Sequence, residues 1–298
     1  MIEVKGLTKN FDRFTALKDI SFEIHDSSVY GLVGVNGAGK STLLRCLSGI
    51  YSEDSGVVML DGERVFDNPS VKAKISFVPD ELYLPPTSSM RAMAKRYQLL
   101  FPNFDMERFK YLTGEFGLKP TSAFNSFSKG MKRQAATILA LACKPKYIFF
   151  DETFDGLDPF KRNYIKKIIA DDVKERGATA VITSHSLKEL EDTCDQLALL
   201  DRGGLVFQSE TEKLKTQKFK LQVAFSEDYG KEKFAGLDVI SYSKHGLVCT
   251  LLVGGEREAV LSHVKSMSPV LLEELPLTLE EVFTYELRQR GYDEEGRV

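Results

Sequence analysis

The chain has 298 residues, a hydrophobic fraction of 43% and a formal net charge of −3 at pH 7. This length allows one large α/β domain and a small one, and the composition is that of an ordinary globular protein. The near balance of acidic and basic residues gives no support to nucleic-acid binding, and no apolar run approaches the roughly 20 residues that span a bilayer. We therefore expect a chain that is soluble by itself and reaches a membrane only through a partner.

Four cysteines are spread along the chain without any CxxC pair: Cys46, Cys143, Cys194 and Cys249. Such wide spacing favours reduced, mostly buried thiols of a cytosolic protein over a disulfide framework or a metal site. The first residues also lack the basic-then-apolar layout of a signal peptide. Both features predict a cytosolic location.

The N-terminal part contains short β-rich runs around one glycine-rich turn. The run Val29–Val33 is nearly all apolar, as a strand buried on both faces of a sheet should be. The segment Ser41–Ser48, which follows the turn, is predicted to form a helix. The other predicted strands are Ile2–Val4, Phe22–Ile24, Val57–Leu60 and Ile75–Val78, with a hairpin signal at Asp61-Gly62.

The middle of the chain is helical and aromatic-rich from Leu84 to Leu118, which indicates a helical insertion. Strands and helices alternate after it, and this alternation predicts a mostly parallel sheet. The predicted helices are Lys129–Ala142, Pro159–Glu175 and Leu187–Cys194. The predicted strands are Tyr147–Phe150, Thr179–Thr183 and Leu197–Leu200.

The texture of the sequence changes near residue 215. The polar and basic segment Lys213–Lys220 is a plausible linker, and β-like runs at Leu221–Phe225 and Leu247–Val253 follow it. Helices are predicted at Glu256–Ser266 and Thr278–Arg290. We therefore expect a large domain over residues 1–212, with a helical subdomain at about 84–145, and a small α+β domain over residues 213–298.

The glycine-rich turn matches the pattern G-x-x-x-x-G-K-[ST] from Gly34 to Ser41, between a predicted strand and a predicted helix. Glycines let successive backbone N–H groups point at phosphate oxygens, and the helix N-terminus adds a positive dipole end. Lys40 is expected to hold the β- and γ-phosphates, and the Ser41 hydroxyl to ligate Mg²⁺. The predicted ATP-binding residues of this segment are Asn36, Gly37, Ala38, Gly39, Lys40, Ser41 and Thr42.

The apolar strand Tyr147–Phe150 delivers two carboxylates, Asp151 and Glu152, at its carboxyl end. Ligands bind at that edge of a parallel sheet. Asp151 is expected to hold Mg²⁺, largely through water, and Glu152 to orient or deprotonate the attacking water. Together with the glycine-rich turn, these residues predict ATP hydrolysis.

With these motifs the chain resembles an ATP-binding cassette (ABC) protein, specifically the ATPase subunit of a transporter. The resemblance covers about residues 1–212 and implies an α/β P-loop NTPase cassette with a parallel-sheet core, an antiparallel β subdomain and a helical subdomain. The segment at Ser128, Lys129, Gly130 and Met131 occupies the place of the family's LSGGQ signature, although Lys129 and Met131 replace a glycine and a glutamine. By resemblance it contacts the γ-phosphate bound by a second copy.

Further residues receive roles from the same resemblance. Asp158 would contact the opposite phosphate-binding loop, and His185 would hydrogen-bond the γ-phosphate and the attacking water. Phe11 matches the aromatic residue that stacks on adenine, with Phe14 as the competing candidate. Asp80 stands where the family usually has a glutamine that senses Mg²⁺, and a carboxylate there would ligate the metal directly or through water, or only cap a helix.

The resemblance also implies partners. Two copies would close around two ATP molecules, with one integral membrane permease receiving the motion at the cytoplasmic face of the membrane. The helical insertion would carry the contact surface, with Leu82, Tyr83, Leu84, Met90 and Met93 as candidate apolar contacts or as local core. No nucleic-acid partner is expected.

The signature and the C-terminal Thr278–Phe283 resemble bacterial cassettes that export drugs, bacteriocins or amphipathic peptides. The alternative is a non-transport ABC ATPase acting on the ribosome or on nucleic acid. A DNA-repair member would need a long coiled coil, a ribosome factor normally carries two cassettes, and a small-molecule P-loop kinase would lack the signature and His185. The sequence therefore favours an ATP-driven exporter subunit.

Overall fold

The computed structural model describes residues 1–154, 156–211, 213 and 218–289. The chain divides into two compact units, Met1–Gln208 and Ser209–Val298. Residues 212 and 214–217 of the predicted linker, and Arg290 of the predicted last helix, lie outside the described residues. In the described part of the chain, no helix is both long and apolar enough to cross a bilayer.

An antiparallel sheet opens the first unit, with strand order β2-β1-β4-β5. Its strands are β1 (Ile2–Phe11), β2 (Phe14–Ile24), β4 (Ser55–Leu60) and β5 (Glu63–Arg64). The hairpin between β4 and β5 turns at Asp61-Gly62, where both residues have positive φ, as the sequence predicted. β1 and β2 are longer than predicted because their exposed positions carry polar residues between the buried apolar ones.

A six-stranded sheet forms the core of this unit, in the order β10-β9-β3-β8-β7-β6. The pairs β3/β8, β3/β9, β6/β7 and β7/β8 are parallel, which confirms the predicted parallel core. The strands are β3 (Val29–Val33), β6 (Ile75–Val78), β7 (Tyr147–Asp151), β8 (Thr179–Ser184), β9 (Gln196–Asp201) and β10 (Gly204–Glu210). β3, β7 and β8 are buried along their whole length.

Four helices accompany these strands: α1 (Lys40–Leu47), α2 (Pro69–Lys72), α6 (Pro159–Arg176) and α7 (Leu187–Leu190). One hydrophobic core joins α1 to both sheets, since it includes Leu43 and Leu47 of α1, Ile2 and Val58 of the antiparallel sheet, and Phe149 of β7. The buried Tyr147 adds a polar link, because its hydroxyl donates to Asp61 Oδ1 at 2.6 Å. The two sheets of the first unit are therefore packed as one body.

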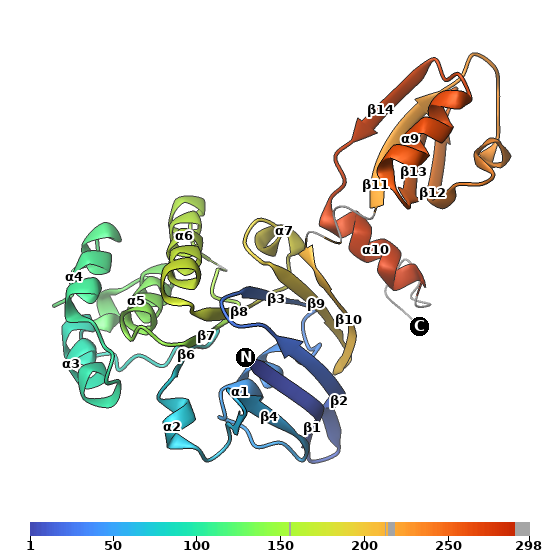
Figure 1. The fold of residues 1–298 in the computed structure, drawn as a ribbon. Helices are drawn as coiled ribbons and strands as arrows, with labels where there is room; N and C mark the ends of the chain where they lie inside the picture. Colours follow the sequence, from blue (N-terminus) through green and yellow to red (C-terminus); the bar gives the residue numbers. More distant parts are fainter. Residues whose placement is uncertain (155, 212, 214–217, 290–298) are drawn as a thin grey trace. The chain divides into compact units, whose positions relative to one another are not determined.

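A helical subdomain is inserted between β6 and β7, and Figure 1 shows its helices α3 and α4 beside α5. It contains α3 (Met90–Leu100), α4 (Met106–Glu115), the 3₁₀ turn η1 (Phe124–Ser126) and α5 (Lys129–Ala142). Side chains of Ser89, Asp105 and Ser128 cap the three α-helices. The first helix begins at Met90 rather than near Leu84, because Pro85-Pro86 holds the preceding residues extended.

The second unit is a four-stranded antiparallel sheet in the order β12-β13-β11-β14, with α9 packed on one face. Its strands are β11 (Lys218–Ala224), β12 (Asp238–His245), β13 (Val248–Gly254) and β14 (Leu271–Leu275). Its helices are the 3₁₀ turn η2 (Lys231–Phe234), α9 (Arg257–Ser266) and α10 (Leu279–Gln289). This is the small α+β fold that the sequence predicted.

Some predicted elements differ from the structure. The helix predicted at Leu187–Cys194 ends at Leu190 and is followed by a turn. Strands β10, β12 and β14 had not been predicted. β10 and β12 expose polar residues in alternation, and β14 exposes two adjacent glutamates, so none is apolar along its length as the predicted strands are.

Candidate active site

The loop between β3 and α1 is held open by two glycines in crowded positions. Gly39 caps α1 with a φ of 104°, and a Cβ there would lie 2.8 Å from the Ala16 carbonyl oxygen. A Cβ on Gly34 would lie 2.4 Å from the Leu200 carbonyl oxygen. No larger residue fits either position, so the glycines allow the backbone N–H groups at the start of α1 to face a ligand.

Lys40 is the first residue of α1 and is only 4% exposed. Its Nζ donates to the carbonyl oxygens of Gly34 at 2.7 Å and Val35 at 3.1 Å, and it lies 3.2 Å from Glu152 Oε1. A buried ammonium group needs such compensation because water no longer solvates it. Lys40 therefore places a buried positive charge at the centre of the loop, in contact with the Glu152 carboxylate.

Asp151 ends β7 and is fully buried. Its Oδ1 accepts hydrogen bonds from Ser41 at 3.0 Å and Thr183 at 2.9 Å, while its Oδ2 is buried without a hydrogen-bond partner. Burial raises the pKa of the Asp151 carboxyl above its ordinary value, and the two hydroxyl hydrogen bonds offset only part of that rise. An unpartnered buried carboxylate oxygen beside a serine hydroxyl suits a hard cation such as Mg²⁺.

Glu152 follows with a left-handed backbone, at a φ of 45°. This conformation is strained for a residue other than glycine and persists where the surroundings fix it. The Glu152 N–H donates to Thr183 Oγ1 at 2.9 Å, and Arg133 Nη1 donates to the Glu152 carbonyl oxygen. His185 approaches from the end of β8, with Nδ1 at 3.8 Å from Glu152 Oε2.

Asp80 lies just beyond β6 and does not stand alone. Arg133 Nη2 donates to its Oδ1 at 2.6 Å and to its carbonyl oxygen at 2.9 Å. The Asp80 side chain is 49% exposed, whereas that of Arg133 is 3% exposed. The predicted metal ligand is thus ion-paired to an arginine of the signature helix α5.

A cavity of about 430 Å³, the loop cavity, opens beside these residues. It is lined by Phe14, Ala16, Asn36, Gly37, Gly39, Lys40, Ser41, Thr42, Asp80 and Glu152. Ala38 is buried within the loop itself. The aromatic lining residue is Phe14, which is 64% exposed. Phe11, the first candidate for adenine stacking, packs edge-on against Tyr51 with ring centroids 5.4 Å apart and does not line the cavity. The structure therefore favours the competing candidate, Phe14.

The signature residues lie elsewhere in the same unit. Ser128 caps α5 by accepting the Met131 N–H at 3.2 Å, and Asp158 caps α6 by accepting the Lys161 N–H at 3.0 Å. A Cβ on Gly130 would lie 3.3 Å from the Gly156 carbonyl oxygen, so the two segments are neighbours. Ser128, Lys129, Gly130, Met131 and Asp158 do not line the loop cavity, and Asp155 lies outside the described residues.

A second hollow of about 430 Å³, the apolar groove, lies beside β6. Its lining includes Leu82, Tyr83 and Leu84, as proposed from the sequence, together with Pro79, Glu81, Tyr97, Phe101, Ala136 and Ala140. Tyr83 is 89% exposed. Met90 is fully buried and therefore belongs to the local core, and Met93 contacts Arg96 without lining the groove.

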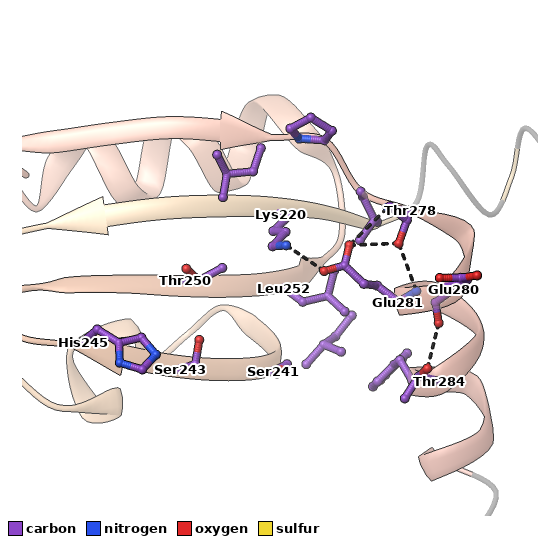
Figure 2. Close-up of a pocket in the computed structure, with 15 residues that line it drawn as sticks. Lys220, Ser241, Ser243, His245, Thr250, Leu252, Thr278, Glu280, Glu281 and Thr284 are labelled. Atoms are coloured by element: carbon purple, nitrogen blue, oxygen red, sulfur yellow. Dashed lines mark hydrogen bonds and ion pairs between the residues drawn. The ribbon is translucent and has the colours of Figure 1, made fainter. Parts of the chain in front are cut away.

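The C-terminal unit has a cavity of its own, of about 890 Å³, between the sheet face opposite α9 and the start of α10. Figure 2 shows Lys220 of β11 pointing at Glu281 of α10, with Nζ 2.6 Å from Oε1. The other Glu281 oxygen accepts from the N–H of Thr278 at 3.1 Å and from its hydroxyl at 3.2 Å. Lys220 and Glu281 therefore already satisfy one another.

Sequence reasoning missed two residues of the site, Arg133 and Thr183. Thr183 donates to Asp151 and accepts from Glu152, so it fixes both carboxylate residues. A hydroxyl at the end of an otherwise apolar strand was its signal. The signal for Arg133 was a charge among the buried positions of an amphipathic helix, together with Thr137 one turn later.

Comparisons with known proteins agree with this geometry. A family model described as ABC transporter matches residues 17–155. The ABC transporter ATP-binding protein YtrB of Bacillus subtilis (strain 168) is 30% identical over 283 residues, which cover 95% of this chain and 97% of YtrB. The linearmycin resistance ATP-binding protein LnrL of the same strain is 32% identical over 213 residues, covering 69% of this chain and 68% of LnrL.

Among solved structures, the dimeric post-hydrolysis state of the ATP-binding cassette MJ0796, bound to ADP and Pi, matches with a TM-score of 0.65. The match covers 71% of this chain and 99% of that chain at 20% identity, so it shows a shared fold. Other relatives are named for methionine import and for lipopolysaccharide export. Similarity alone therefore leaves the direction of transport open.

Proposed function

Because this chain belongs to the family of ABC transporter ATP-binding proteins and is therefore an ATPase, we propose that it powers an export system through a separate membrane permease. The observation that carries the catalytic part is the meeting of Lys40, Ser41, Asp151 and Glu152 at one edge of the parallel sheet. These groups supply a phosphate-binding cation, two metal-binding oxygens and a general base at or directly beside the loop cavity.

The first step is binding of the ATP phosphates by the loop. The backbone N–H groups at the start of α1 and the Lys40 ammonium face the loop cavity, where the β- and γ-phosphates would lie. Ser41 and Asp151 would hold Mg²⁺, which when bound neutralises charge on the phosphates. Phe14 would cover the adenine ring at the open side of the cavity.

The second step is activation of water by Glu152. Its carboxylate lies 3.2 Å from Lys40, and phosphate binding would draw the ammonium away and leave the carboxylate to accept a proton. His185, at 3.8 Å from the same carboxylate, would orient the water and the γ-phosphate. Thr183 and Arg133 hydrogen-bond the peptide groups of Glu152 and so position its carboxylate for this exchange.

A second copy would complete the site. Ser128 and Asp158 cap helices whose N-termini lie outside the loop cavity of their own chain. A helix N-terminus capped by a hydroxyl suits an anion, and we assign Ser128–Met131 to the γ-phosphate on the partner copy. Asp158 would contact the partner's phosphate-binding loop, so ATP would close the dimer and hydrolysis would release it.

We propose that the permease binds in the apolar groove. The groove presents the exposed Tyr83 between the half-buried Leu82 and Leu84, next to Tyr97 of α3 and to Phe101, and exposed apolar surface of this kind marks interaction sites. Docking there would place the chain at the cytoplasmic face of the membrane. The export of a drug or amphipathic peptide is supported by the name of LnrL, a resistance protein.

Replacement of Glu152 by Gln tests the catalytic part of this proposal. The amide keeps the shape but cannot take a proton, so hydrolysis should fall by at least about 100-fold while an ATP-bound dimer accumulates. Phosphate release and size-exclusion chromatography with ATP measure the two effects, and the exposed Glu175→Gln serves as a matched control. A near-normal rate in the Glu152 variant would exclude Glu152 as the base.

The proposed direction of transport can be tested in cells from which the gene for this chain has been deleted. An export system predicts greater sensitivity to amphipathic drugs or peptides, restored by the intact chain and not by Glu152→Gln. Unchanged sensitivity together with poor growth on one limiting nutrient would instead indicate import. This outcome would overturn the proposed direction while leaving the ATPase mechanism in place.

A further inference from the structure

Arg133 joins the backbone of Glu152 to the loop at Asp80, whose neighbours line the apolar groove. We propose that it is a positioning residue, through which the loop at Asp80 and the backbone of Glu152 move together. The inference rests on the catalytic role proposed above for Glu152. It adds a physical connection between the loop cavity and the apolar groove, carried by one side chain.

The connection consists of one guanidinium with two partners. Nη1 donates to the Glu152 carbonyl oxygen, while Nη2 donates to the carbonyl oxygen and the Oδ1 of Asp80, at 2.9 and 2.6 Å. A guanidinium is planar and its donors have fixed relative directions. A shift of either partner therefore strains the hydrogen bonds to the other.

Asp80 lies between the loop cavity and the apolar groove. Its own side chain lines the loop cavity, whereas its neighbours Pro79 and Glu81 line the apolar groove. Arg133 is similarly placed on α5, because Ala136 and Ala140 further along the helix also line the groove. A partner seated in the groove would thus press on both ends of the Asp80–Arg133 pair.

The other end of the connection is the strained residue of the site. Glu152 has a φ of 45°, and its peptide groups are held by Thr183 on one side and Arg133 on the other. Thr183 belongs to the buried strand β8 and is itself 1% exposed. Of these two hydrogen-bond partners of Glu152, only Arg133 also bonds the loop at Asp80, beside the groove. A displacement of that loop can therefore reach the Glu152 backbone through Arg133, while Thr183 keeps its place in β8.

The chain contains no tryptophan, which allows a single fluorescent reporter at Tyr83 in the groove. In the double variant Tyr83→Trp, Glu152→Gln, addition of Mg-ATP should change the tryptophan fluorescence. Adding Arg133→Lys should abolish that change while radiolabelled ATP still binds, because a lysine cannot hold both partners at once. As a control, replacement of the neighbouring Lys132 by Gln should leave the signal intact.

Kinetics provide a second measurement with Glu152 present. Arg133→Lys should lower kcat with little change in KM for ATP, since Arg133 does not line the loop cavity. If Arg133→Lys fails to fold, Asp80→Ala replaces it, because that side chain is half-exposed. The Asp80 variant should also lose the fluorescence change.

Retention of the full fluorescence change in folded Arg133→Lys, or in Asp80→Ala, would overturn the proposal. The signal would then reach the tryptophan reporter directly from the nucleotide. Failure of the Glu152→Gln trap, by contrast, would be seen as continued ATP hydrolysis and would count against the catalytic assignment. The two failures are therefore distinguishable in the same set of samples.

Discussion

The loop cavity and the C-terminal cavity both contain a lysine–glutamate pair, but they keep it in different surroundings. Lys40 and Glu152 are 4% and 18% exposed, and their neighbour Asp151 is fully buried with one carboxylate oxygen unpartnered. Lys220 and Glu281 are 25% and 38% exposed, and Glu281 is further satisfied by Thr278. The first cavity keeps unsatisfied charge out of water, whereas the second contains a local structural contact.

The pKa values of Asp151, beside the loop cavity, and of Glu281, in the C-terminal cavity, are shifted in opposite directions. Burial raises the pKa of Asp151 despite its hydrogen bonds. Burial also acts to raise the pKa of Glu281, but the hydrogen bonds from Lys220 and Thr278 outweigh it and hold that pKa below its usual range. Ionisation thus costs stability at the first carboxyl and contributes stability at the second.

The largest effect is expected when the buried lysine of the loop cavity, Lys40, is replaced. Lys40→Met should weaken ATP binding by about 100-fold, equivalent to about 2.8 kcal/mol, because two charge-assisted hydrogen bonds to phosphate are lost. Equilibrium binding of radiolabelled ATP measures this, with the exposed Lys18→Met as control. Binding within about threefold of the original chain would refute the role given to Lys40.

Replacement of Asp151 by Asn should separate stability from activity. Hydrolysis should fall by about 100-fold, while the midpoint of thermal unfolding rises by about 2–4 °C for a gain on the order of 1 kcal/mol. Because the folded pKa is raised, the penalty is complete above that value, shrinks as the pH falls below it and is absent below the pKa of the unfolded chain. Thermal scans from neutral to acidic pH should therefore show the difference shrinking.

The aromatic side of the loop cavity gives an intermediate effect. Phe14→Ala should weaken ATP binding by about tenfold, or about 1.4 kcal/mol, because one stacking surface is lost. Phe11→Ala should change binding by less than about threefold, since that ring packs on Tyr51. The reverse order of effects would return the adenine site to Phe11.

The smallest effect is expected in the C-terminal cavity. Glu281→Gln should lower the free energy of unfolding by at most about 1 kcal/mol and leave ATP hydrolysis unchanged, because the ion pair is partly exposed. A lowered folded pKa contributes stability above the ordinary glutamate range, and this contribution is lost as the pH falls through the folded value. The variant and the original chain should unfold alike at low pH, and Lys220→Met should behave in the same way.

The parts of the fold that the sequence predicted best are two mostly apolar strands and one helix with clear end signals. Val29–Val33, Ile75–Val78 and Lys129–Ala142 were predicted with the bounds that the structure has. β12 was missed because a register shift between Val239 and Ser241 changes the phase of its alternation. Periodicity indicates an element only where one phase persists along it.

The candidate site divides in a similar way. The glycine-rich loop comes directly after the buried strand β3, and Asp151 and Glu152 stand at the carboxyl end of the buried strand β7. The carboxyl ends of parallel strands lie at one edge of the sheet, so the sequence could predict that these two segments meet. Phe11 and Phe14 are paired directly across the β1–β2 hairpin, so the strand pattern does not distinguish them, and only the three-dimensional placement of the hairpin shows that Phe14 lines the cavity. The contact of Arg133 with Asp80 joins residues 53 positions apart, which no local pattern specifies.

The left-handed backbone at Glu152 bears on how such a chain can change over evolutionary time. A glycine or an asparagine would adopt a φ of 45° with less strain, so selection for stability alone would favour either at this position. Neither could accept a proton from water. Glutamate at position 152 thus keeps catalysis at the cost of backbone strain. Substitutions that relieve this strain should arise readily in lineages where hydrolysis is no longer required.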